Sequence, residues 1–356
     1  QFSVFQFDKK QNSPVLFIGY LSWHDHLARF LINFNEESDK TYLQSFKAQC
    51  QFDGVVVPPG GQRTSRWVMI GVGSRPNTLI RDYADKVGIY HGVKPPADDP
   101  PSVFCTWYFF GLDYNEKWFQ KDLKALQDLA ENRNRMPFDV FLIDECWQLL
   151  NWGDFEAVES FPGGMKAAAD QIEKLGYIPG IWTPPYLVDP GTDLAEKHPE
   201  WLLKDEKGER ITFHMNDMDH WVLDPTYPGV CDYLEKSYRK LSEDWGYEYF
   251  KFDFMRAVIQ PKGQQFYDST KTRFQAYREG LKAIRKGVGP DAYLSMCGGH
   301  YGASLGIVNS QRSGSDVKSM WNESLTEYRQ NILRTWMNRL WHTDADAMMI
   351  RKREEK

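Results

Sequence analysis

Cysteine is scarce in this sequence, and long hydrophobic runs are absent from it. The five cysteines are odd in number, scattered over 356 residues and free of Cys-x-x-Cys spacing, which argues against a disulfide framework or a zinc site. No stretch reaches the roughly 18 consecutive apolar residues of a membrane span, so we expect no membrane partner. The eight histidines lack the HxH or HExxH spacing of a metal-dependent hydrolase.

A surplus of basic charge is also missing. The formal net charge is −6 and no basic stripe is present, so nucleic acid is not an expected partner. The chain begins at Gln1 and has no signal-like hydrophobic segment, so we expect a processed protein or part of a longer one. The compartment stays open, with a soluble cytoplasmic location favoured over secretion.

Aromatic residues, in contrast, are abundant. They make up 15% of the chain and include 13 Trp. Part of this content belongs to the core, but Trp and Tyr also form the walls of sugar-binding sites, because the apolar face of a pyranose packs on an aromatic plane. The composition is therefore a first, general indication of carbohydrate binding.

The first part of the chain is predicted to be β-structure. Short β-rich segments, separated by turn-rich breaks, occur at residues 3–7, 15–23, 28–35, 45–52 and 66–73. A helical pattern follows at 77–92, and then a proline-rich linker at 93–102. We assign residues 1–95 to part of an N-terminal β-sandwich-like domain with its connecting helix, and residues 96–356 to a second domain.

Strands and helices alternate after the linker. Strand-like segments lie at 103–111, 138–147, 177–188, 247–255, 292–299, 307–316 and 345–352. Repeated β–α units of roughly 30–50 residues favour a parallel sheet. An open doubly wound sheet would usually show an early glycine-rich phosphate loop, and the sequence has none. We therefore expect an α/β fold, a (β/α)8 TIM-type barrel.

Most strand candidates end in polar or aromatic residues, where such a barrel holds its catalytic groups. These residues are Trp107, Asp144, Glu145, Trp182, Asp253, Cys297 and Asp316. In "YEYFKFDFM", Lys251 and Asp253 interrupt an apolar run. Residues two apart on a strand point to the same side, so the pair is either a structural ion pair or two groups facing an active site.

Two carboxyl groups that flank a scissile bond are what glycoside hydrolysis needs. Asp253, at a strand end beside Lys251, suits an ionised nucleophile, because a nearby cation favours the charged carboxylate. Asp316 lies in a segment rich in glycine and serine, which suits a proton donor on a loop. Each acid also has a structural interpretation. Asp316 could be a turn or cap residue, and the acidic pair at 144–145 could begin a helix or bind a metal, while "CGGH" at 297–300 could be a Cys/His nucleophile or a turn.

The order of the motifs carries more weight than any one of them. "TWYFFG", "FLIDECW", "GYIPGIWTPPYLV", "YFKFDFM", "LSMCGG" and "RSGSDV", read in order, resemble the barrel of the melibiase-like α-galactosidases of glycoside hydrolase family 36, whose clan includes family 27. The resemblance covers about residues 20–356 and is close from residue 100 onward. It implies a retaining exo-glycosidase that removes terminal α-galactosyl residues by double displacement, without a cofactor. The implied partner is an α-galactoside oligosaccharide or glycoconjugate, and family members are often homo-oligomers.

The resemblance also assigns roles to residues. Asp253 corresponds to the nucleophile and Asp316 to the acid/base, and retention predicts carboxyl groups about 5–5.5 Å apart. The implied substrate-binding residues are Asp144, Glu145, Lys251, Arg312, Trp182, Trp107, Cys297 and Gly298. On this interpretation Lys251 and Asp253 share a side of their strand because both face the sugar.

Two features depart from the family pattern. The acidic pair that grips the 4- and 6-hydroxyls of galactose is usually Asp-Asp, whereas here it is Asp144 and Glu145. The added methylene extends the side chain by about 1.5 Å and could change the preferred sugar. The chain also begins within the family's β-domain and stops before the last helix and eighth barrel strand. Because an open barrel edge is unfavourable, we expect a piece of a longer protein or a partner that completes it.

Other functions stay open at this point. An α-N-acetylgalactosaminidase or an α-galactosyl transglycosylase would use the same two carboxylates, and the former needs room at the 2-position, near Arg312 and residues 297–300. A catalytically inert carbohydrate-binding protein would have no need of both carboxylates. A metal-dependent hydrolase would have to combine Asp144 and Glu145 with a histidine.

Overall fold

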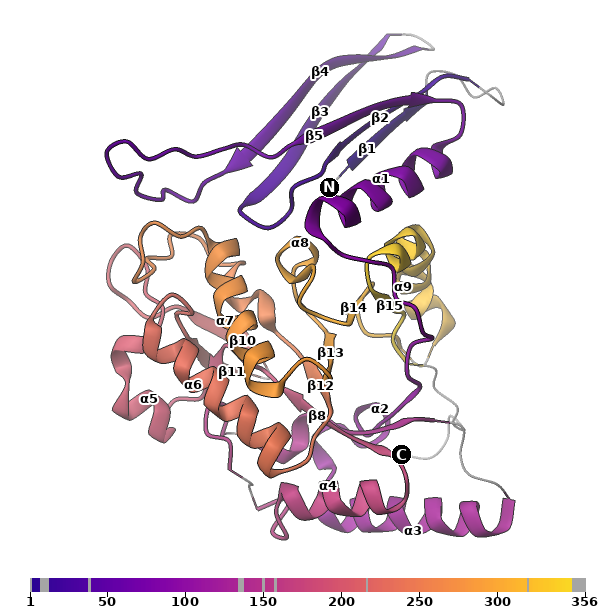
Figure 1. Ribbon diagram of the computed structural model, residues 1–356, viewed down its shortest axis with the longest axis vertical. Helices are drawn as coiled ribbons and strands as arrows, with labels where there is room; N and C mark the ends of the chain where they lie inside the picture. Colours follow the sequence, from indigo (N-terminus) through magenta and orange to yellow (C-terminus); the bar gives the residue numbers. More distant parts are fainter. Residues whose placement is uncertain are drawn as a thin grey trace.

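A computed structural model describes residues 2–6, 13–37, 40–133, 138–148, 151–156, 159–215, 217–318 and 320–347. A β-rich layer formed by the first part of the chain lies over a larger β/α body (Figure 1). No helix within these ranges is long and apolar enough to cross a membrane.

The β-rich layer contains two antiparallel sheets. One has the order β1-β2-β5, from β1 (Phe2–Gln6), β2 (Val15–Tyr20) and β5 (Val68–Gly73), and the other is the hairpin of β3 (Leu27–Glu37) and β4 (Lys40–Gln51). Tyr20 stacks on Phe30 with 4.3 Å between ring centroids, and this contact joins the two sheets. Each of the five predicted β-segments overlaps one of these strands.

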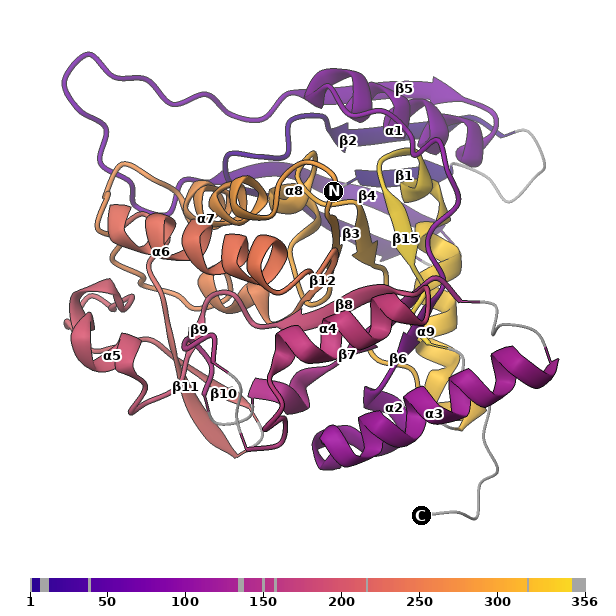
Figure 2. The ribbon, with the colours of Figure 1, turned by 60° about the horizontal axis from the view of Figure 1, so that its bottom comes forward.

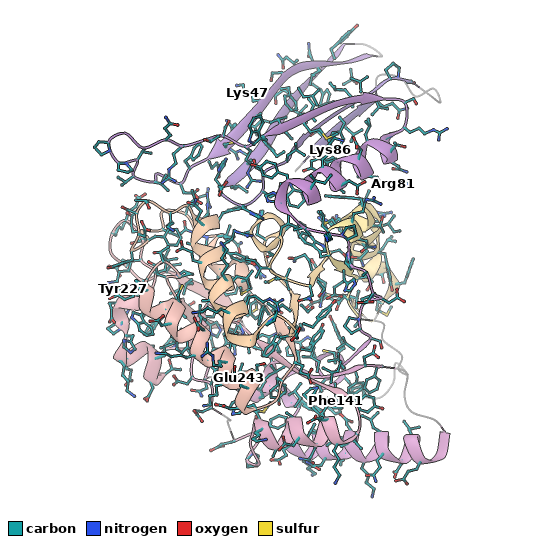
Figure 3. The ribbon with its side chains drawn as sticks, viewed as in Figure 1. Lys47, Arg81, Lys86, Phe141, Tyr227 and Glu243 are labelled. Atoms are coloured by element: carbon teal, nitrogen blue, oxygen red, sulfur yellow. The ribbon has the colours of Figure 1, made fainter. Side chains whose placement is uncertain are left out.

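Helix α1 (Pro76–His91) connects this layer to the β/α body. It begins with a proline at its first turn and ends at Gly92, whose φ of 66° stops the helix in the left-handed conformation. Its buried residues Tyr83 and Val87 belong to a hydrophobic cluster that includes Leu340 and Trp341 from the end of the body. Arg81 and Lys86 lie on the exposed side of the helix (Figure 3). An apolar interface therefore holds the two regions together.

The body is built on a parallel sheet with the strand order β15-β14-β13-β12-β8-β7-β6. Its strands are β6 (Val103–Cys105), β7 (Val140–Ile143), β8 (Ile178–Thr183), β12 (Tyr249–Phe252), β13 (Tyr293–Met296), β14 (Ser310–Arg312) and β15 (His342–Asp344). Helices surround its outer side, namely α3 (Glu116–Arg133), α4 (Met165–Lys174), α6 (Pro228–Arg239), α7 (Arg273–Val288) and α9 (Trp321–Arg334) (Figure 2). The predicted parallel β/α architecture is confirmed. Within the described ranges, no pairing closes the sheet between β15 and β6.

The two faces of this sheet differ in polarity because side chains alternate along each strand. Phe141 (labelled in Figure 3), Phe250 and Leu294 lie in the large hydrophobic cluster. The ring of Phe141 contacts that of Phe119 on α3. The opposite, concave face carries Lys251, among other polar side chains. The charged residue inside the apolar run therefore points to the hollow side of the sheet.

Two predicted strands needed correction. Of residues 103–111, only Val103–Cys105 is a strand, and the aromatic run continues as α2 (Trp107–Phe110) and the turn η1 (Gly111–Asp113). Tertiary context overrides the β-propensity of those aromatics once the chain leaves the sheet. The final strand is His342–Asp344, ahead of the predicted 345–352, of which residues 348–352 lie outside the described ranges.

A small antiparallel sheet was not predicted. It consists of β9 (Leu187–Val188), β10 (Thr212–Met215) and β11 (Met218–Val222) in the order β10-β11-β9. It follows β8, together with α5 (Asp193–Lys197) and η3 (Pro199–Trp201). The hairpin of β10 and β11 brings Met215 to the lining of the candidate active-site cavity, which is described below.

Candidate active site

A cavity of about 460 Å³ lies at the C-terminal ends of the parallel strands. Its lining residues are Trp107, Asp144, Glu145, Trp182, Met215, Lys251, Asp253, Phe254, Arg256, Cys297, Gly298, Gly314, Ser315 and Asp316. Every predicted site residue except Arg312 is among them. Arg312, at the end of β14, binds Asp316 directly. The fold therefore brings together residues that the sequence spreads over more than 200 positions.

Asp144 is the centre of a buried polar cluster at the end of β7. Its Oδ2 accepts hydrogen bonds from Nζ of Lys251 at 2.7 Å and from Sγ of Cys105 at 3.3 Å. Burial alone lowers the pKa of Lys251, but Asp144 and other nearby groups outweigh it and raise that pKa well above its usual value. Lys251 thus forms a buried ion pair, with Asp144 as the partner, and it also lines the cavity.

Glu145 begins the short 3-10 helix η2 (Glu145–Gln148) and is 3% exposed. Burial, together with the carboxylates of Asp144 and Asp253, raises the pKa of Glu145 to about 8. At neutral pH this carboxyl group is therefore mostly protonated. It offers a hydrogen-bond donor beside the Lys251–Asp144 ion pair.

Asp253 follows β12 and is held by two donors. Its Oδ1 accepts from the backbone N–H of Phe254 at 2.7 Å, and its Oδ2 accepts from Nε1 of Trp182 at 3.4 Å. Phe254 has a φ of 51°, which is uncommon for a residue with a side chain. The chain therefore turns sharply directly after Asp253, and this turn aims the carboxylate into the cavity.

Gly298 provides the space beside this carboxylate. A Cβ at this position would lie 2.9 Å from Oδ1 of Asp253 and 2.7 Å from Nη1 of Arg256, and the φ of 63° also favours glycine. The carbonyl of Gly298 accepts from the backbone N–H of Arg256 at 3.0 Å. Sequence reasoning missed Arg256, although it lies only three residues after Asp253.

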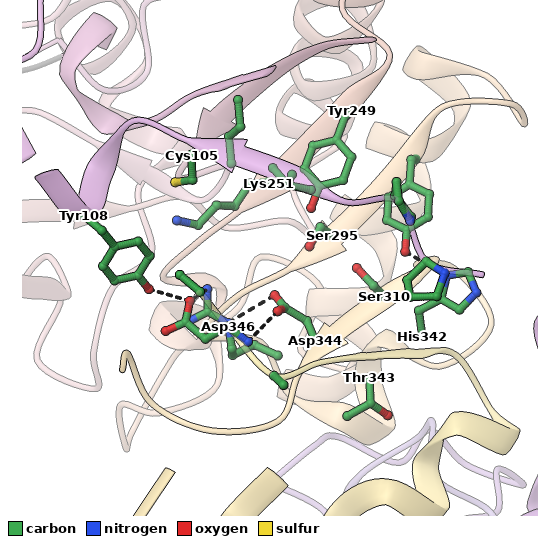
Figure 4. Close-up of a pocket in the computed structure, with 18 residues that line it drawn as sticks. Cys105, Tyr108, Tyr249, Lys251, Ser295, Ser310, His342, Thr343, Asp344 and Asp346 are labelled. Carbon is green, nitrogen blue, oxygen red and sulfur yellow. Dashed lines mark hydrogen bonds and ion pairs between the residues drawn. The ribbon is translucent and has the colours of Figure 1, made fainter. Parts of the chain in front are cut away.

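Asp316 is the exposed acid of the site. Its side chain is 52% exposed, whereas that of Arg312 is 6% exposed, and Nη1 of Arg312 lies 3.0 Å from Oδ1 of Asp316. Two further acids hold the other nitrogens of Arg312. Asp344 lies 3.1 Å from Nε and Asp346 lies 2.9 Å from Nη2 (Figure 4).

Asp344 and Asp346 were also missed by sequence reasoning. Asp346 accepts a hydrogen bond from the hydroxyl of Tyr108 (Figure 4). It also accepts one, at 2.7 Å, from the backbone N–H of Val317. The available signal was the pair of alternating acids in "HTDAD". It marks the C-terminal end of β15, the position at which the other strands also carry polar groups.

Trp182, Trp107 and Cys297 contribute the less polar walls. Trp182 is 1% exposed and packs against Trp152, with 5.6 Å between ring centroids. Burial raises the pKa of Cys297 well above its usual value, so the thiol is protonated. A protonated buried thiol is a poor nucleophile, which argues against Cys/His chemistry at residues 297–300.

His300 has a structural contact instead. Its Nδ1 accepts from the backbone N–H of Gly302 at 3.2 Å and caps the short helix α8 (Tyr301–Ser304). The turn interpretation of "CGGH" therefore agrees with the geometry. In the described part of the chain, no group of three or more His, Cys, Asp or Glu side chains is arranged to hold a metal ion.

A curved parallel β/α sheet with carboxylates at the C-terminal ends of its strands is typical of the β/α-barrel class of folds. A family model described as Melibiase matches residues 97–289, which is more than half of the chain. The chain belongs to this family. The matched stretch contains Asp144 and Asp253, whereas Cys297, Arg312 and Asp316 lie beyond it.

Named relatives agree with this assignment. The chain is 25% identical to an α-galactosidase of Escherichia coli over 152 residues, or 40% of this chain and 21% of that protein. It is 24% identical to a probable α-galactosidase of Dictyostelium discoideum, over 70% of this chain and 54% of that protein. The structure of the Thermus thermophilus α-galactosidase TtGalA in complex with stachyose superposes with a TM-score of 0.71 at 25% identity, over 96% of this chain and 68% of that one. The chain thus spans about a fifth of the Escherichia coli relative and about half of the Dictyostelium one.

Proposed function

We propose that this protein is a retaining exo-glycosidase of the α-galactosidase type, which removes terminal α-galactosyl residues from oligosaccharides or glycoconjugates. The observation that carries the proposal is the contrast between two carboxylates of one cavity. Asp253 is fixed by two hydrogen bonds at the end of a strand, and Asp316 is exposed on a loop beside Arg312. A fixed acid suits a nucleophile, and an exposed loop acid suits exchange of protons with the aglycone and with water.

In the proposed first step, Asp253 attacks the anomeric carbon and Asp316 donates its proton to the departing oxygen. A glycosyl–enzyme ester on Asp253 results. In the second step, Asp316 removes a proton from water, and the water oxygen displaces Asp253 with a second inversion. The two inversions leave the anomeric configuration unchanged.

The other cavity residues would bind the hydroxyls of the sugar. A protonated Glu145 would donate to one hydroxyl, while the Lys251–Asp144 pair would provide a donor and an acceptor for its neighbours. Trp107 would pack against the apolar face of the ring, and the buried Trp182 would close the wall beside Asp253. Cys297 and Gly298 would border the sugar beside Asp253.

The proposal follows the relatives in its choice of substrate. TtGalA has been studied in complex with stachyose and with p-nitrophenyl α-D-galactopyranoside. Glu145 in place of the usual Asp favours a second candidate, a sugar that differs from galactose at the 4- or 6-position, because the longer side chain changes the space around those hydroxyls. An α-N-acetylgalactosaminidase would depend instead on room at the 2-position, near Arg312 and residues 297–300. A transglycosylase would use the same residues with a sugar acceptor in place of water.

The decisive experiment is nitrophenol release from the α-galactoside and the α-N-acetylgalactosaminide, by the protein and by Asp253→Ala. We expect turnover of at least one substrate and a loss of at least about 10⁴-fold in the variant. NMR of the first-formed sugar should show the α-anomer. Formation of the β-anomer would contradict the retaining mechanism, and no turnover of either glycoside would contradict the substrate class.

A further inference from the structure

A second cavity lies between the β-rich layer and the β/α body. Its volume is about 610 Å³, within the range of small-molecule sites, and it shares no lining residue with the candidate active site. Its walls come from β1, β3 and neighbouring loops of the β-rich layer on one side, and from α7, α8, α9 and the 3-10 helix η6 (Thr335–Arg339) on the other. The proposed glycosidase chemistry makes no use of it.

The charged side chains that line this cavity are all basic. Arg29, Arg66 and Arg334 line it, and none of its described lining residues is Asp or Glu. None of these three guanidinium groups has an ion-pair partner among the described residues. A concave surface with one sign of charge concentrates ligands of the opposite sign.

Arg66 is the most informative of the three. It is 9% exposed, its Nη2 donates to the carbonyl of Trp23 at 2.7 Å, and its buried Nε has no hydrogen-bond partner among the described residues. Burial lowers the pKa of Arg66 to about 10, so the group is still charged at neutral pH. The exposed Asp25 acts on the charge of Arg66 without forming an ion pair with it. A buried guanidinium without an ion-pair partner is unfavourable unless an anion binds it, and its planar fork matches a carboxylate or phosphate.

Aromatic rings form the remaining walls. Trp23 and Trp336 meet edge to face, with 6.3 Å between ring centroids, and Phe274 lies 5.5 Å from the guanidinium of Arg66. Trp23 is 3% exposed and closes the wall, whereas Trp336 and Tyr301 are half-buried, and exposed aromatic rings pack on the apolar face of a pyranose. The cavity therefore combines an anion-binding group with a surface suited to a sugar ring.

We propose that this cavity binds a pyranose that carries an anionic group, either a carboxylate or a phosphate. Arg66 pairs with the anion, and Trp336 and Tyr301 contact the ring. The site is also adjacent to the loop of Asp316, because the hydroxyl of Tyr301, at 3.3 Å, and Nη1 of Arg334 both donate to the carbonyl of Ser313.

Isothermal titration calorimetry tests the proposal with four probes: D-glucuronate, D-glucose 6-phosphate, D-glucose and inorganic phosphate. We expect one of the two anionic sugars to saturate a single site, and glucose and phosphate alone to bind at least about tenfold more weakly. The stronger of the two sugars identifies the anion. The proposal would be overturned if glucose or inorganic phosphate bound as tightly as the anionic sugars. It would also be overturned if neither anionic sugar showed saturable binding.

Two exposed neighbours on α9 provide a matched pair of variants. Leu333 lines the cavity and is 69% exposed, whereas Ile332 is 71% exposed and does not line it. Leu333→Glu places a negative charge at the cavity and should weaken binding at least about tenfold, while Ile332→Glu should leave it unchanged. Arg66→Gln should abolish binding. Because that buried variant could misfold, the two α9 variants decide the outcome, and equal affinities in them would overturn the proposal.

Discussion

Asp346 binds Arg312 with one carboxylate oxygen and the backbone N–H of Val317 with the other. The distances are 2.9 Å from Oδ1 to Nη2 of Arg312 and 2.7 Å from Oδ2 to the nitrogen of Val317. Val317 directly follows Asp316, so one side chain fixes both the arginine and the chain around the exposed acid. Asp346 is thus a positioning residue for Asp316 and does not itself need to contact the substrate.

Two substitutions separate these contacts. Asp346→Asn loses the ion pair but keeps an oxygen that can accept from Val317, whereas Asp346→Ala loses both contacts. We expect kcat to fall about tenfold in the first variant and about 100-fold in the second, with a shifted pH–rate profile, because displacement of a catalytic group by about 1 Å has effects of this size. Steady-state kinetics over a range of pH measures kcat and the pH–rate profile of each variant. Equal losses in the two variants would show that the bond to Val317 has no role.

Gly298 leads to a prediction about crowding beside Asp253. Gly298→Ala places a methyl group 2.9 Å from Oδ1 of Asp253 and 2.7 Å from Nη1 of Arg256, which forces one of them to move. We expect kcat/KM to fall about 100-fold. Gly246→Ala is the matched control, because its φ of 82° is equally left-handed but the added methyl group meets nothing within 4 Å.

Both variants carry a similar backbone strain, which should lower the unfolding free energy in urea by about 1–2 kcal/mol, and Gly298→Ala should lose more because of its crowded methyl group. Only Gly298→Ala should lose activity. A Gly298→Ala enzyme with the activity of the Gly246→Ala enzyme would mean that the crowded carboxylate and guanidinium adapt without consequence.

The buried pair of Lys251 and Asp144 predicts non-additive stability. Each single change, Lys251→Met or Asp144→Asn, leaves the partner without its buried counterpart and should cost about 3–5 kcal/mol of unfolding free energy. The loss of unfolding free energy in the double variant should be about 1–3 kcal/mol smaller than the sum of the two single losses. Urea denaturation of the parent protein, the two single variants and the double variant completes this double-mutant cycle. Additive losses would contradict a direct pairing.

The sequence was sufficient to predict the parallel architecture, because "VFLI" is a continuous apolar run and "YFKF" is aromatic apart from Lys251, and both lie between amphipathic helices. It was also sufficient to predict which of the candidate residues meet, since parallel strands present their C-terminal ends at one edge of the sheet. Whether Asp253 and Asp316 have the proposed roles stays a prediction.

Other features depend on tertiary context. The partner of Lys251 proved to be Asp144, which is 107 residues away in the chain and invisible to a local pattern. Arg256 reaches the cavity because Phe254 turns the chain with a positive φ, a conformation that phenylalanine rarely adopts. The predicted strand at 345–352 would include Asp346, whereas β15 ends at Asp344 and Asp346 follows it.

Glu145 leads to a prediction about pH. Burial and the neighbouring carboxylates raise its pKa to about 8, so the folded protein holds this proton between about pH 4.5 and pH 8, where the unfolded chain has released it. The contribution of Glu145 to the free energy of unfolding is therefore greatest at low pH, falls as the pH rises from about 4.5 to about 8, and is constant above that. If the protonated carboxyl donates to the sugar, kcat/KM should decline above about pH 8.

Glu145→Gln provides the test, because glutamine has the same length and keeps a donor at every pH. We expect the variant to retain activity at neutral pH within about tenfold and to lose the alkaline decline attributable to Glu145. Its unfolding free energy should also fall less steeply between pH 5 and pH 8 than that of the parent protein. An unchanged alkaline limb in the variant would show that another group titrates there. A variant inactive at every pH would mean that the ionised carboxylate, and not the carboxyl O–H, binds the substrate.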